Sequence, residues 1–209
     1  MIWHHIEKGH GRPLILLHGI GMNSEAWAPV MERLAIQRRV ISFDIPGFGK
    51  TPGIQGREPN SEAMVVSLAQ SLTKMGIDEP VDIVGNSLGG RIMFDAAAEG
   101  LARSIVGISP AGLWREKGPG HIEPLFGAMR KMYKTMPGVV DRMLKTTAGR
   151  TLIMAGAVSA RGWKMPAHEA IRSARMFADS HHFDPIFEAF RPPFLRGSEI
   201  SVPCTVAFG

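Results

Sequence analysis

Residues 81–90 read VDIVGNSLGG, and this stretch decides the expected fold. A short apolar-rich run typical of a buried strand leads into a Gly-x-Ser-x-Gly pattern, and an alanine-rich helical segment follows from Leu88. A serine at such a junction lies on a tight, strained turn that lifts its hydroxyl above the end of a sheet. Gly85 and Gly89 omit side chains that would clash across this turn. We therefore predict Ser87 as a nucleophile. The alternative is a glycine-rich strand-to-helix turn without chemistry.

Short apolar runs alternate with helical patterns through the first half of the chain. Apolar runs without polar alternation are typical of strands buried on both faces, and strands separated by helices form parallel sheets. The sequence thus predicts an α/β fold with a mostly parallel sheet and helices on both faces. Asn60 or Ser61 is the expected N-cap of the second helix, and Gly76 its stop. The predicted strands are residues 14–17, 39–43, 81–84 and 104–108, and the predicted helices are residues 25–35, 61–75 and 88–99.

A second motif, HGIG at residues 18–21, follows the first predicted strand. Glycines such as Gly19 allow the backbone to approach a ligand closely. We predict that the amides of Ile20 and Leu88 form an oxyanion hole, in which a single donor contributes about 3–4 kcal/mol to transition-state stabilisation. His18 is a candidate catalytic base or a structural residue. We favour the structural role because His18 ends a strand on the oxyanion side.

A third motif, DIPGFG at residues 44–49, follows the second predicted strand and forms a rigid turn. Asp44 has two interpretations. It is either the acid of a catalytic triad or a structural acceptor that fixes the turn, and we favour the structural acceptor.

The pattern changes after Pro110, and no convincing strand is found up to residue 161. Residues 122–136 carry apolar side chains at three- and four-residue spacing, which predicts an amphipathic helix. Such a helix packs over a pocket or lies on a membrane surface, and we favour the pocket. A further helix is expected near residues 167–178. Residues 202–208 indicate a fifth buried strand, in which Cys204 would be a small buried hydrophobe.

Charge and composition limit the classes of function. The net charge of +5 is concentrated between residues 111 and 196, which hold 14 lysines and arginines against 7 acidic residues. This excess favours a solvated basic face or a mild preference for anionic substrates, and no nucleic-acid motif accompanies it. The single cysteine, the absence of a signal-peptide pattern and the absence of a membrane-spanning apolar run indicate a cytoplasmic protein. No metal or cofactor motif is present.

Together, the motifs LLHG, DIPGFG and GNSLGG resemble those of the α/β-hydrolase superfamily, at its usual separations. The resemblance is to the cap-bearing group that includes esterases, haloperoxidase-like hydrolases and carbon–carbon bond hydrolases. Ser87 at the elbow disfavours the relatives with an aspartate nucleophile. The resemblance implies a core at residues 1–110, a helical cap at 111–165 and a return to the core at 166–209.

The resemblance also implies a catalytic acid and histidine beyond residue 209, with one more strand and a closing helix. The open alternatives are a truncated chain without activity, or a base from within the sequence: His121, His168, His181 or His182. The expected function is hydrolysis of an ester or related acyl substrate, small and apolar or mildly anionic, without cofactor or metal. Carbon–carbon bond hydrolysis and non-catalytic binding of a small ligand are the alternatives. The oligomeric state is left open.

Overall fold

The structure is a computed structural model that describes residues 1–114, 118, 120, 122–155, 159 and 161–208. The chain forms two compact units. The first unit comprises Met1–Gly118 together with His181–Gly209, and the second comprises Pro119–Ser180.

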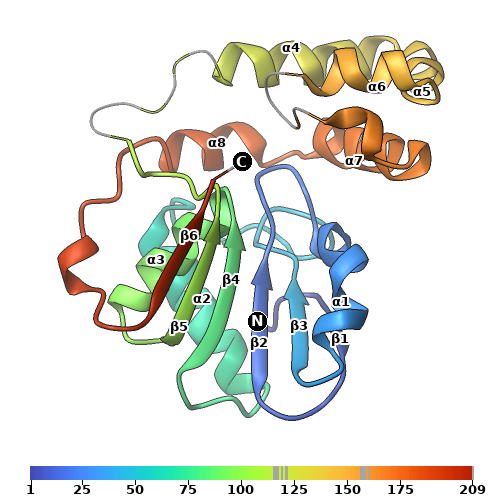
Figure 1. Cartoon of the computed structure of the whole chain (residues 1–209). Coiled ribbons are helices and arrows are strands. Elements are labelled where there is room, and N and C mark those ends of the chain that lie inside the picture. Colours follow the sequence, from blue (N-terminus) through green and yellow to red (C-terminus); the bar gives the residue numbers. More distant parts are fainter. Residues whose placement is uncertain (115–117, 119, 121, 156–158, 160, 209) are drawn as a thin grey trace. The chain divides into compact units, whose positions relative to one another are not determined.

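A six-stranded sheet forms the centre of the first unit, in the order β1-β3-β2-β4-β5-β6 (Figure 1). All neighbouring pairs are parallel except β1 with β3, so the predicted mostly parallel α/β fold is confirmed. The antiparallel edge strand β1 was not predicted, because HIEK is short and half exposed and offers no apolar run. The strands are β1 (His5–Lys8), β2 (Pro13–Leu17), β3 (Arg39–Phe43), β4 (Val81–Asn86), β5 (Ala102–Ile108) and β6 (Cys204–Ala207).

Helices cover both faces of this sheet. Along β2, Ile15 and Leu17 belong to one apolar cluster with residues of α2 and α3, whereas Leu14 and Leu16 belong to another that contains Met31 of α1. Successive strand residues point to opposite faces, so the two clusters lie on opposite sides of the sheet. The helices of this unit are η1 (Ser24–Trp27), α1 (Ala28–Leu34), α2 (Ser61–Lys74), α3 (Leu88–Ala98), α8 (Phe183–Ala189) and η3 (Gly197–Glu199).

Local signals in the sequence set several helix ends. The side chain of Asn60 accepts a hydrogen bond from the Ala63 amide at the start of α2, which confirms the first of the two predicted caps. Gly76 follows α2 with a φ of +71°. The segment predicted as one helix over residues 25–35 is instead a 3-10 turn followed by α1. Pro29 lies in the first turn of α1, where proline is favoured because its missing N–H would have no helical partner there.

The last strand corrects one prediction. Every residue of β6 is exposed, including Cys204, whereas we expected a buried strand and a buried thiol. Among the described strands, β6 pairs with β5 alone, so its other side has no neighbour there.

Among its described residues, the second unit contains the α-helices α4 (Ile122–Thr135), α5 (Pro137–Leu144), α6 (Thr147–Met154) and α7 (Ala167–Asp179), with a short 3-10 turn, η2 (Gly162–Lys164). Their buried core includes Leu144 and Ala170. The hydroxyl of Tyr133 donates to Asp141 at 2.6 Å and accepts from Arg175, which ties α4, α5 and α7 together. Because α7 packs against α4 and α5, this compact unit extends to Ser180. The cap at residues 111–165 and the return to the core at 166–209 stay predictions. A lid function for this unit stays a prediction.

In the part of the chain that the structure describes, no helix is long and apolar enough to cross a membrane.

Candidate active site

Ser87 occupies the turn between β4 and α3, in a backbone conformation that side chains rarely adopt. Its φ is +48° and its ψ is −112°. Hydrogen bonds fix this conformation from three directions. The Ser87 amide donates to the carbonyl of Ile108 at 3.1 Å, and the Ser87 carbonyl accepts from the amides of Arg91 at 3.1 Å and Ala111 at 2.9 Å. Strain of this kind costs about 1–3 kcal/mol and persists only where the surroundings enforce it.

Three glycines make this turn possible through close backbone approach. A Cβ atom on Gly85 would lie 2.3 Å from the carbonyl oxygen of Gly89, and one on Gly89 would lie 2.3 Å from that of Leu17. A Cβ on Gly90 would lie 2.6 Å from Pro110. The sequence pattern identified the first two glycines, and only the structure adds Gly90.

The hydroxyl of Ser87 is available for chemistry. The residue is half-buried at the amino end of α3, and none of the residues that the structure describes hydrogen-bonds to Ser87 Oγ. The helix dipole and the unpaired amides at a helix start favour negative charge at this position. The turn therefore presents an unpaired hydroxyl at a position that favours negative charge, and the role of Ser87 as a nucleophile stays a prediction.

The HGIG loop lies directly beside this turn. A Cβ on Gly19 would lie 3.5 Å from Ser87 Cβ, and the Met22 amide donates to the Gly19 carbonyl at 3.2 Å to close a tight turn with Gly21 at a φ of +74°. This turn does not use the amide of Ile20. Within the described ranges, neither this amide nor that of Leu88 donates a hydrogen bond. Both are thus free for an oxyanion, and that role stays a prediction.

His18 is fully buried, and backbone groups occupy both of its ring nitrogens. Nδ1 donates to the Gly19 carbonyl at 2.7 Å, and Nε2 accepts from the Ile45 amide at 3.0 Å. Burial lowers the pKa of His18 to about 4, so the ring is neutral at pH 7. The neutral imidazole thus joins the HGIG loop to the DIPGFG loop. It has no free lone pair with which to take a proton from Ser87, which supports the structural interpretation of His18.

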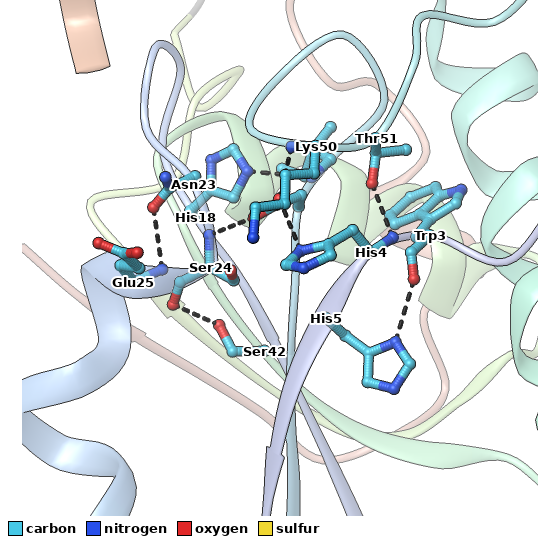
Figure 2. Close-up of polar contacts among 12 residues, drawn as sticks. Trp3, His4, His5, His18, Asn23, Ser24, Glu25, Ser42, Lys50 and Thr51 are labelled. Atoms are coloured by element: carbon cyan, nitrogen blue, oxygen red, sulfur yellow. Dashed lines mark hydrogen bonds and ion pairs between the residues drawn. The ribbon is translucent and has the colours of Figure 1, made fainter. Parts of the chain in front are cut away.

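Asp44 is also buried and fully used by the fold. Its partners His4, Ser24 and Lys50 are labelled in Figure 2. Its carboxylate accepts from the amides of Ser24 at 2.6 Å and Lys50 at 2.8 Å, and it lies 2.9 Å from Nδ1 of His4. Burial by itself would raise the pKa of Asp44, but the amides of Lys50 and Ser24 hold it below its usual range. These contacts support a structural acceptor that fixes the turn.

A family model described as "alpha/beta hydrolase fold" matches residues 12–157. The match covers both strand-end motifs and Ser87. The chain belongs to this family.

Two curated relatives extend the comparison. A 2-hydroxy-6-oxo-2,4-heptadienoate hydrolase from Pseudomonas putida is 42% identical over 89 residues, which are 41% of this chain and 32% of that protein. A pimeloyl-[acyl-carrier protein] methyl ester esterase from Aliivibrio salmonicida is 37% identical over 90 residues, which are 43% of this chain and 32% of the relative. The chain thus matches about a third of the length of these relatives.

Among solved structures, a thermophilic esterase from Thermogutta terrifontis superposes with a TM-score of 0.68 at 22% identity. The superposition covers 99% of this chain and 74% of that one, so it concerns the fold alone.

The described part of this hydrolase-family chain places no histidine or carboxylate within hydrogen-bonding distance of Ser87. His182 lies against Gly47 and Gly53: a Cβ on Gly53 would come within 2.8 Å of its ring, and one on Gly47 within 2.8 Å of its Cβ. It occupies the residue before α8 without a side-chain hydrogen bond to the helix start. His168 and His181 are exposed. His121 lies outside the described residues. The described residues also contain no group of side chains that could hold a metal ion.

The sequence did not point to two residues that contact the Ser87 turn, Arg91 and Ala111. Ala111 holds the Ser87 carbonyl, and Arg91 joins α3 to segments far away in the sequence. One signal was available for Arg91, which is a charged residue in an otherwise apolar helix start.

Proposed function

We propose that this protein is a serine hydrolase that cleaves an ester or a related acyl substrate. The observation that carries the proposal is the strained Ser87, whose hydroxyl has no partner among the described residues at the amino end of α3. Family membership and the similarity to a named esterase support the same reaction class. The substrate would be small and apolar or mildly anionic, and we retain a cytoplasmic location as a prediction.

The reaction follows from the positions of these groups. Ser87 Oγ attacks the carbonyl carbon and passes its proton to a base, while the amides of Ile20 and Leu88 hold the resulting oxyanion. Collapse of the tetrahedral intermediate breaks the bond to the leaving oxygen, which takes the proton back from the base and departs as the alcohol, while the acyl group stays on Ser87. A water molecule, deprotonated by the same base, then attacks the acyl group, and the acid product leaves while Ser87 regains its proton.

We propose that the base and its acid partner belong to residues beyond 209. The support is that both ring nitrogens of His18 and the Asp44 carboxylate are already used by backbone groups. Substituting His121, His168, His181 or His182 by glutamine in the full-length protein should therefore leave turnover within about threefold of the wild type. A loss of about a hundredfold or more in one of these variants would identify an internal base instead.

Labelling with a fluorophosphonate probe tests the nucleophile. We expect one adduct, located on the peptide that contains Ser87, and none in the Ser87→Ala variant. Absence of any adduct on folded wild-type protein would reject the hydrolase and favour a non-catalytic pocket for a small ligand.

Carbon–carbon bond hydrolysis is the second candidate, favoured by the 42% identity to the heptadienoate hydrolase. The excess of basic residues between 111 and 196 suits an anionic substrate. Turnover of a 2-hydroxy-6-oxo-dienoate should be compared with that of p-nitrophenyl butyrate. A specificity constant at least about a hundredfold higher for the dienoate would favour this candidate over the esterase.

A further inference from the structure

Arg91 is a buried cation on α3, four residues after Ser87. Its side chain is 11% exposed, and Nε donates to Asp95 Oδ2 at 2.9 Å. Nη1 donates to the carbonyl of Pro192 at 2.7 Å, and the guanidinium lies over the ring of Phe194, 5.5 Å from its centroid. Arginine alone among the side chains combines these three contacts, because its planar fork carries several donors and a stacking face.

The position of Arg91 does not favour α3 itself. A cation near the amino end opposes the helix dipole, and an arginine that precedes its acid by four residues is the weaker order of such a pair. A buried ion pair is also weak evidence for stability. The side chain therefore needs an explanation in the segments that it contacts.

Those segments are residues 111–114, which follow β5, and residues 191–194, which follow α8, and both lie within the first unit. The outgoing segment, residues 111–114, passes so close to Arg91 that a Cβ on Gly112 would lie 2.7 Å from Nη1. The returning segment, residues 191–194, is joined to it by two hydrogen bonds. The Phe194 amide donates to the Gly112 carbonyl at 2.9 Å, and Trp114 Nε1 donates to the Arg191 carbonyl at 3.1 Å.

The outgoing segment also supports the nucleophile, because the Ala111 amide donates to the Ser87 carbonyl at 2.9 Å. Pro110 fills the space beside Gly90 in the first turn of α3. Phe94 stacks on Phe194 at 5.2 Å and adds a second attachment of the returning segment to the helix. A continuous set of contacts thus leads from the returning segment through Arg91 to Ser87.

We propose that Arg91, with Asp95 and Phe194, is a positioning residue that clamps the outgoing and returning segments to α3 and so maintains the strained Ser87 turn. We call these three residues the Arg91 clamp. This inference rests on the proposed function, because the turn matters only if Ser87 reacts. It predicts that the clamp affects the reactivity of Ser87 toward even a small reagent that needs no contact with residues 119–180.

The experiment compares variants of the full-length protein by fluorophosphonate labelling and by hydrogen exchange. Arg91→Met keeps the apolar stem and removes the donors, and Arg91→Lys keeps the charge and one donor. Arg103→Met is the matched control, because Arg103 also pairs with an aspartate but lies at the opposite end of the sheet. Phe194→Leu tests the clamp without removing a buried charge.

We expect Arg91→Met to lower the saturating rate of labelling at Ser87 about tenfold, measured below the melting temperature, with little change in half-saturating probe concentration. Arg91→Lys should recover only a small part of this loss, because one ammonium group cannot reach Asp95, the Pro192 carbonyl and the Phe194 ring together. Phe194→Leu should lower the rate by about threefold, and Arg103→Met should label like the wild type. The amide hydrogens of peptides covering residues 108–114 should exchange faster in Arg91→Met and Phe194→Leu than in the wild type. In Arg103→Met they should exchange at the wild-type rate.

A merely stabilising arginine would lower the melting temperature and leave the labelling rate and this exchange unchanged, and that result would overturn the inference. If Arg91→Met does not fold, the same comparison is decided by Phe194→Leu. If wild-type Ser87 takes no label, the proposed function fails. Exchange in residues 108–114 then still decides whether the clamp holds the turn.

Discussion

Two turns at the carboxyl ends of the parallel strands β3 and β4 use polar side chains in opposite ways. The turn after β4 holds Ser87 in a strained conformation, with no hydrogen bond to its hydroxyl from the described residues. The turn after β3 begins with Asp44, whose carboxylate is buried and accepts two backbone amides. An unused polar atom in a strained frame indicates chemistry, whereas a buried and fully paired one indicates structure. The two turns therefore differ in whether a polar atom is left unpaired, and this difference can be tested by substitution at each.

The largest predicted effect is on catalysis at the first turn. Ser87→Ala should reduce turnover of a small ester by about 10⁴-fold or more, because the nucleophile is removed while the oxyanion donors remain. Its effect on the urea midpoint should be small, since the hydroxyl makes no hydrogen bond with the described residues. A Ser87→Ala protein with wild-type turnover would show that the strained turn does not carry the chemistry.

The second turn should respond in the opposite way. Asp44→Asn keeps the shape but replaces one acceptor oxygen by an NH₂ group that faces a backbone amide. We expect a loss of about 2–4 kcal/mol in the free energy of unfolding, measured by urea denaturation, because a buried donor is left unsatisfied. Turnover per folded molecule should change little. Wild-type stability with abolished turnover would instead make Asp44 the triad acid.

His18 belongs with Asp44, and its titration gives the third prediction. The folded-state pKa of about 4 lies below the ordinary 6.5, so the unfolded chain binds the proton first as the pH falls. Stability should therefore decline from about pH 6.5 to about pH 4, by about 3 kcal/mol in total. Asp44, whose pKa is also lowered, adds a further loss at more acidic pH.

Urea midpoints measured at pH 7 and pH 5 check this prediction. His18→Gln offers a donor and an acceptor that do not titrate, so its stability should change less over this range. An equal change in both proteins would assign the pH dependence to other groups.

The sequence predicts the residues that act through their neighbours in the chain and misses those that act through distant partners. Ser87 and its glycines form a contiguous pattern, because a sharp turn depends on neighbours in the chain. The parallel sheet was predicted for a similar reason, since buried strands appear as local apolar runs. Arg91 and Ala111 act through partners that are distant or unremarkable in the sequence, so local pattern does not reveal them. The exposure of β6 depends on its place at the sheet edge, which strand composition does not encode.

The smallest effect concerns the strain itself. Ser87→Gly and Ser87→Ala both remove the hydroxyl, but only glycine adopts a φ of +48° without steric cost. The glycine variant should therefore be more stable than the alanine variant by about 1 kcal/mol, after allowance for the greater freedom of glycine in the unfolded chain. Thermal or urea denaturation of the two inactive proteins measures this difference directly. Because neither protein has a hydroxyl at position 87, the difference in stability between them reports the backbone strain of the first turn alone. Equal stabilities would mean that the turn holds Ser87 without stored strain, and the contrast with Asp44 would then rest on hydrogen bonding alone.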